Sequence, residues 1–207
     1  LPYERRLHHI LTDFMSNCTE VTSPFIVKRE VKKVAVVVFA SNTSLCGGFN
    51  ANVIRHLVDL LAEYKPLGLE NILVFPVGKK VADAVRKLGF RIEGDFQHMA
   101  DKPSYQEAAD LAADLMKRFL HGDVDKVELL YNHFKSTASQ ILTRETYLPI
   151  DLNNEKKEEE RTIDYILEPS AEELMQEMLP KVLRMKMFTV LLDSNAAEHA
   201  ARTMAMQ

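Results

Sequence analysis

The sequence contains no tryptophan, only two cysteines, and no long apolar run. A membrane-spanning helix needs about 18 or more consecutive apolar residues, so direct membrane insertion is not expected. The net charge of −4 argues against a general nucleic-acid binder. Cys18 and Cys46 share no pairing motif, which favours two free thiols in a reducing compartment.

Cofactor and metal motifs are also missing. Neither the GxGxxG nor the GxxxxGK[ST] phosphate-binding pattern occurs, and the histidines lack ligand spacing with cysteines or carboxylates. No cofactor and no metal are therefore expected. The chain has no signal-peptide pattern, and it begins at Leu1 rather than at methionine, which suggests an excised fragment.

The rest of the chain is organised around residues 31–50, VKKVAVVVFASNTSLCGGFN. Residues 34–40 form a short apolar run rich in β-branched side chains, which is typical of a strand buried on both faces. Polar residues and Gly47-Gly48 then predict a turn, and Asn50 is the expected N-cap of a helix over residues 50–65. This order, strand, glycine turn and helix, opens a βαβ unit.

Strands and helices continue to alternate along the chain. Further strands are expected at residues 71–77 and 126–134 and within 90–99, and helices at 79–89 and 104–120. Ser104 and Glu107 form a predicted capping box for the last of these helices. Residues 139–150 and 161–167 have the composition of a hairpin with a long polar loop. The pattern predicts an α/β fold, a Rossmann-like and mostly parallel sheet with helices on both faces and an antiparallel extension.

The two ends of the chain have a different pattern. Residues 3–16 place apolar side chains at helical spacing, and residues 170–207 contain no glycine and only Pro180. The alanines of the second helix would allow close approach of the first, with a possible kink at Pro180. We therefore expect an antiparallel helical hairpin from residues 1–20 and 170–207, the base of a coiled coil, projecting from a head domain of residues 21–169.

Catalytic alternatives centre on Cys46. It lies in a strand-to-helix turn, where α/β hydrolases place a nucleophile, although no base is identifiable beside it. A cysteine-dependent α/β hydrolase or amidotransferase is therefore one alternative. A Rossmann-type nucleotide-binding module that uses Gly47-Gly48 is another. The alternative to both is a packed thiol and a tight structural turn.

Several motifs resemble one known family, the gamma subunit of the F-type ATP synthase, and they occur in the family's order. They are residues 45–50 (LCGGFN), 101–104 (DKPS), 127–134 (VELLYNHF), 165–173 (YILEPSAEE) with 179–180 (LP), and 197–206 (AEHAARTMAM). The chain departs from the family pattern at Asn42, Thr43 and Ser44, and again at Thr203. The resemblance covers essentially the whole chain.

The resemblance implies a non-catalytic rotor subunit in the central stalk, which couples ion flow through the membrane ring to ATP synthesis. Implied partners are the alpha and beta subunits of the catalytic ring, the epsilon subunit and the membrane rotor ring. It also implies that Glu198 and Arg202 contact the beta subunits, and that the complex holds the chain at the cytoplasmic face of the bacterial inner membrane. The signature turn would be structural, through Leu45, Cys46, Gly47, Gly48 and Asn50.

Overall fold

The computed structural model describes residues 23–151 and 171–207. Its sheet has the strand order β3-β2-β1-β4-β5. The first four strands run parallel to their neighbours, and β5 is antiparallel to β4, as the sequence predicts. The strands are β1 (Val34–Phe39), β2 (Ile72–Val77), β3 (Arg91–Ile92), β4 (Lys126–Ser136) and β5 (Ser139–Leu148).

The central strand β1 is buried along its whole length because helices cover both faces of the sheet. Ala35, Val37 and Phe39 point into one core, which α4, α5 and α6 cover. Val34 and the other alternate residues point into a second core beneath α2 and α3. A strand with two dry faces needs apolar side chains at every position, which explains the uninterrupted run.

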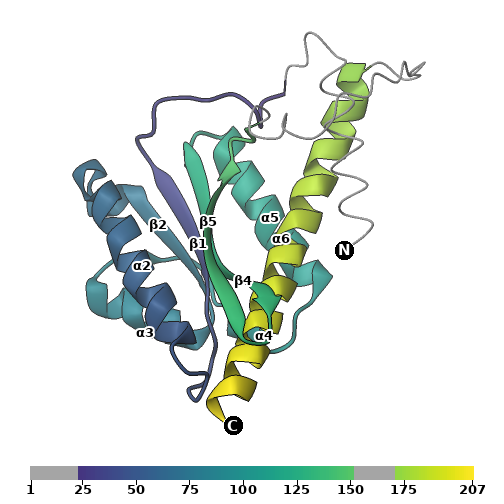
Figure 1. Cartoon of the computed structure of the whole chain (residues 1–207). Coiled ribbons are helices and arrows are strands. Elements are labelled where there is room, and N and C mark those ends of the chain that lie inside the picture. Colours follow the sequence, from purple (N-terminus) through teal and green to yellow (C-terminus); the bar gives the residue numbers. More distant parts are fainter. Residues whose placement is uncertain (1–22, 152–170) are drawn as a thin grey trace.

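The helices are α2 (Phe49–Tyr64), α3 (Lys79–Leu88), α4 (Gln97–Asp101), α5 (Tyr105–Leu120) and α6 (Ala171–Ala205). Two short 3-10 turns, Lys65–Leu67 and Leu69–Asn71, join α2 to β2. Figure 1 shows α2 and α3 on one side of the sheet and α5 and α6 on the other. This arrangement confirms the predicted α/β class.

Residues 90–99 contain the short strand that the sequence predicts, followed by a helix. Only Arg91–Ile92 pairs with β2, and from Gln97 the chain is helical. Gly94 has a φ of +75°, which turns the chain out of the sheet. The Asp95 carboxylate then accepts a hydrogen bond from the Gln97 N–H at 3.1 Å, a turn that sets up α4.

The expected capping box at α5 is half formed. Ser104 Oγ accepts a hydrogen bond from the Glu107 N–H at 3.4 Å, as predicted. The Glu107 carboxylate does not complete the box; it pairs with His98 Nδ1 at 2.9 Å. His98 of α4 takes the place of the reciprocal bond, and the local sequence spacing does not predict this partner.

Helix α6 runs without interruption through Pro180 and packs along the sheet beside α5. Its buried side chains on the sheet are Met175, Leu179, Leu183, Met187, Val190 and Leu191. Residues 3–16, 161–167 and Ser170 lie outside the described residues, so the helical hairpin, the second hairpin strand and the cap at Ser170 remain predictions. Within residues 23–151 and 171–207, none of the helices has the length and apolarity needed to cross a bilayer.

The segment before β1 is tied to the turn before β4 by Asp125. Its carboxylate accepts hydrogen bonds from the Lys32 and Lys33 N–H groups at 2.9 and 3.0 Å and pairs with Arg29 Nε at 2.8 Å. Burial raises the pKa of Asp125, but these two N–H groups and the Arg29 guanidinium outweigh it, so the pKa lies below its ordinary value of 3.8.

We expect Asp125→Asn to lower the free energy of unfolding by about 2 kcal/mol at pH 7, because an uncharged acceptor binds Arg29 and the N–H groups more weakly. A lowered folded-state pKa contributes stability that is complete above the unfolded value and is lost as the pH falls through the folded value. The difference in the free energy of unfolding between the parent and the variant should therefore be constant from about pH 5 to 7 and should shrink below about pH 4. Urea unfolding at each pH measures this gap, and a gap that did not change with pH would contradict the assignment.

Candidate functional site

Three segments distant in the sequence meet where β1 and β4 end: the loop of residues 41–50, the end of the β4–β5 hairpin, and the C-terminal third of α6. We call the loop of residues 41–50 the signature loop. It contains all five residues of the predicted signature turn. The junction of this loop with α6 is the candidate functional site.

Two residues of the signature loop have left-handed backbone conformations. Gly47 has a φ of +58°, which glycine adopts without a steric cost. Leu45 has a φ of +67°, uncommon for a residue with a side chain, and its side chain is 74% exposed. The loop therefore presents a large apolar side chain to solvent on an unfavourable backbone conformation.

Asn50 is not the N-cap of α2, which corrects the sequence prediction. The helix begins at Phe49 with Gly48 as its N-cap, two residues earlier, and the Phe49 N–H bonds to the Cys46 carbonyl at 3.2 Å. Asn50 instead turns its carboxamide back to the loop. Its Oδ1 accepts from the Ser41 N–H at 3.0 Å, and its Nδ2 donates to the Thr43 carbonyl at 3.2 Å. The Asn50 side chain thus forms hydrogen bonds with backbone groups of the loop that have no partner in the helix.

Cys46 is a packed thiol. It is 1% exposed and lies in a small cluster with Phe49 and Ala197. Asn50 Nδ2 donates to its sulfur at 3.2 Å, and Ser41 Oγ lies 3.8 Å away. Within the described part of the chain, the polar partners of the Cys46 sulfur are Ser41, Asn50 and the Thr43 carbonyl, and none of them is a histidine. A general base is therefore not paired with Cys46, and the hydrolase or amidotransferase alternative has no support.

We expect the Cys46 thiol to react with a water-soluble disulfide reagent at least about 100-fold more slowly in the folded chain than in the unfolded chain, because burial hides the sulfur. The measurement uses a Cys18→Ser background, so that only one thiol is counted. Equal rates in the two states would show that the signature loop opens readily and that Cys46 is accessible.

The glycine turn is partly covered by α6, which bears on the nucleotide-binding alternative. A Cβ placed on Gly47 would lie 3.7 Å from the Cβ of Ala205. The hollow beside it has a volume of about 330 Å³ and is lined by neutral residues of the loop, the β4–β5 hairpin and α6. It contains no lysine or arginine, the side chains that a phosphate site generally supplies. The described residues also contain no cluster of three or more potential metal ligands.

Glu198 and Arg202, the predicted contact residues, lie together at this junction. Their side chains pair at 2.7 Å, one helical turn apart, and are 14% and 25% exposed. The Arg202 guanidinium also donates to the Ser44 carbonyl at 2.5 Å and to Thr43 Oγ1 at 2.8 Å. Arg202 therefore links α6 to the part of the loop that departs from the family pattern. Neither the family motif nor the spacing of the two residues along the helix indicates these bonds to the loop.

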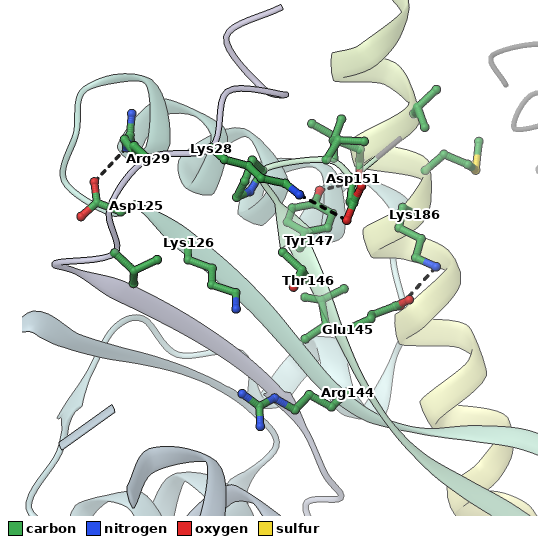
Figure 2. A pocket seen from close by; sticks show the side chains of 17 residues that line it. Lys28, Arg29, Asp125, Lys126, Arg144, Glu145, Thr146, Tyr147, Asp151 and Lys186 are labelled. Carbon is green, nitrogen blue, oxygen red and sulfur yellow. Dashed lines mark hydrogen bonds and ion pairs between the residues drawn. The ribbon is translucent and has the colours of Figure 1, made fainter. Parts of the chain in front are cut away.

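A larger hollow, of about 710 Å³, lies nearer the other end of α6, beside β5. Figure 2 shows Lys186 of α6 reaching Glu145 of β5, and Lys28 reaching Asp151. The other basic residues of its wall, Arg29, Lys126 and Arg144, are also ion-paired. The Tyr147 hydroxyl donates to the Leu183 carbonyl, and burial raises the pKa of Tyr147. With its charges paired, this wall serves the packing of α6 on the sheet.

Comparisons with known proteins agree with the motifs. The family model described as ATP synthase matches residues 1–207. The chain is 77% identical to the ATP synthase gamma chain of Phocaeicola vulgatus, covering 100% of this chain and 72% of that protein. It is 56% identical to the ATP synthase gamma chain of Bacteroides thetaiotaomicron, covering 100% of this chain and 73% of that protein.

A solved structure has the same fold. The central stalk and c-ring structure of the Tetrahymena thermophila mitochondrial ATP synthase contains a chain that matches with a TM-score of 0.65. That match has 21% identity and covers 99% of this chain and 92% of the other. The fold, the family model and the high identity to bacterial relatives agree, and they place the chain in the ATP synthase gamma chain family.

Proposed function

We propose that the chain works as the rotor of an F-type ATP synthase, carrying torque between the membrane rotor ring and the catalytic ring of alpha and beta subunits. A part with this task needs a stiff connection between its helix and its head, and it needs no catalytic site of its own. Membership of the gamma chain family is the observation that carries the proposal.

The placement of α6 supports this role. The helix has 35 residues, which corresponds to about 52 Å at 1.5 Å per residue. Its first half contributes side chains to the core of the sheet, and Arg202 near its end bonds to the signature loop. A load applied to the far end of α6 therefore reaches a closely packed core, which deforms little.

We also propose that the signature loop and the end of α6 form a contact with the beta subunits. Leu45, Met204 and Met206 expose apolar side chains here, at 74%, 46% and 71%. Glu198 and Arg202 would act at this contact largely by ordering the loop, because Arg202 bonds to the loop and Glu198 holds Arg202. The opposite end of the head would face the epsilon subunit and the rotor ring.

Two further parts of the proposal rest on the family. The chain would divide into a helical stalk base of residues 1–20 and 170–207 and a head of residues 21–169. The stalk base would continue into the shaft, and the head would lie at the base of the shaft. The place of the chain would be the cytoplasmic face of the bacterial inner membrane, where the complex holds it.

The test replaces the matching part of the Phocaeicola vulgatus gamma chain with this chain and assembles it with that organism's alpha, beta and epsilon subunits. We expect a stable complex that hydrolyses ATP and rotates a probe attached to the head. Leu45→Asp is expected to weaken assembly, whereas Val58→Asp, at an exposed apolar residue in the middle of α2 and away from both ends of the head, is not. A folded chain that joins no complex would contradict the proposal.

A further inference from the structure

Apolar packing sets how α6 is turned about its own axis, because one face of the helix is buried in the close-packed core of the sheet. A rotor helix is loaded by twisting as well as by bending. Hydrogen bonds and ion pairs from the helix to the head add directional restraints to this packing, and those placed away from the helix axis resist twisting most directly.

Asp193 makes such a bond on one side of α6. Its Oδ2 lies 2.6 Å from His133 Nδ1, and its Oδ1 accepts from the Phe134 N–H at 2.8 Å. Both groups belong to β4, where its pairing with β5 becomes irregular beyond Phe134. Both oxygens of the Asp193 carboxylate bond to groups of β4, and the side chain is 20% exposed. Asp193 therefore restrains α6 through two bonds to the same strand.

Asn195 makes a bond on nearly the opposite side. Two positions further along a helix correspond to a rotation of about 200°. Its Nδ2 donates to the Ala100 carbonyl at 3.2 Å, in the last turn of α4. Carbonyl groups in the last turn of a helix lack an intrahelical partner, so this bond satisfies an acceptor that would otherwise need water.

We propose that Asp193 and Asn195 are an opposed pair of positioning residues that lock α6 against rotation on the head and so transmit torque. This inference rests on the proposed rotor function and specifies where the load passes. Rotation of α6 about its axis displaces both side chains from their partners, Asp193 from β4 and Asn195 from α4, on opposite sides of the helix. Arg202, seven residues beyond Asn195, lies on nearly the same side as Asn195 and holds the loop.

The experiment uses the assembled complex with the membrane ring, in which the head is attached to the ring and a probe reports angular fluctuations of the shaft. Variants are Asp193→Ala, Asn195→Ala and both together. The matched control is Lys181→Ala, on the same helix, whose partner Glu177 also belongs to α6 and therefore does not reach the head. His133→Lys also places an N–H donor opposite Asp193 and serves as the conservative variant.

We expect the double variant to lower the torsional stiffness by about half, with smaller losses in the single variants, because directional bonds are removed while the packing stays. The ratio of ATP-driven proton pumping to ATP hydrolysis should fall with the stiffness. Lys181→Ala and His133→Lys should stay close to the parent. Thermal unfolding of each complex separates a loss of stiffness from a loss of folding.

A double variant with the stiffness and the pumping ratio of the parent would overturn the inference. If Asp193→Ala prevents assembly, Asn195→Ala and His133→Ala test the two sides separately, and unchanged stiffness in both would have the same consequence. Failure of the rotor function itself would look different, because the parent chain would then form no rotating complex before any of these substitutions is made.

Discussion

Gly78→Ala is expected to lower the free energy of unfolding by about 4 kcal/mol, a large share of the 5–15 kcal/mol of a typical domain. Gly78 links β2 to α3 with a φ of +117°, a conformation that side chains rarely adopt. A Cβ at this position would lie 2.3 Å from the Ala40 carbonyl oxygen. That oxygen belongs to the backbone at the end of β1, so it cannot move aside as a flexible side chain could.

Gly89→Ala is the matched control. Gly89 also has a positive φ, +78°, as the left-handed C-cap of α3, but a Cβ there would meet nothing within 4 Å. The cost should be the backbone strain alone, about 1–2 kcal/mol. Because the chain has no tryptophan, far-ultraviolet circular dichroism during urea unfolding is the suitable measurement. Equal losses in the two variants would mean that the contact with Ala40 contributes nothing.

Glu128→Ala should have the second largest effect, about 3 kcal/mol. Glu128 is 3% exposed within the sheet and binds two cations, Arg144 through both carboxylate oxygens at 3.2 Å and Lys126 at 3.2 Å. Removing it leaves two positive charges close together without their shared partner. Both cations are partly exposed, so water offsets part of the cost and the loss stays at the lower end for a broken buried pair.

Glu63→Ala removes the more exposed of the two carboxylates that pair with the Arg144 guanidinium. Glu63 pairs with Arg144 at 2.9 Å, but its side chain is 57% exposed, so the loss should be within about 0.5 kcal/mol. Unfolding free energies of the two variants and the parent, measured at pH 7 in the same buffer, decide the point. If Glu128→Ala costs no more than Glu63→Ala, burial is not what makes this pair stabilising.

The elements that could be predicted were those with local signals. The β-branched run of β1, the helix predicted at residues 79–89 and the Ser104 cap of α5 all depend on neighbours in the sequence, and all three were correct. The antiparallel extension of the sheet at residues 139–150 followed from composition, but the hairpin of β5 with β4 was not predicted. Such features need only a few consecutive residues, so a single sequence contains them.

The parts that were wrong or missed depend on partners far along the chain. Asn50 has the residue type of an N-cap, yet it bonds to Ser41 because the loop returns to the helix. Glu107 pairs with His98 for a similar reason. Motif resemblance identified Arg202, but its bonds to Thr43 and Ser44 span almost 160 residues, and no periodicity predicts them.

The late position of α6 in the sequence affects how the protein folds while it is being synthesised. Met175, Leu183 and Met187 share a core with Val37 and Phe39, from which they are separated by most of the chain. At about 5–20 residues per second, the ribosome makes the β1 residues on the order of ten seconds before their α6 partners. During that time one face of the growing sheet has no helix α6 to cover it, and it should attract chaperones. Only chains that have been translated through α6 can then complete the core of the head. Incomplete chains are therefore not expected to assemble into the complex.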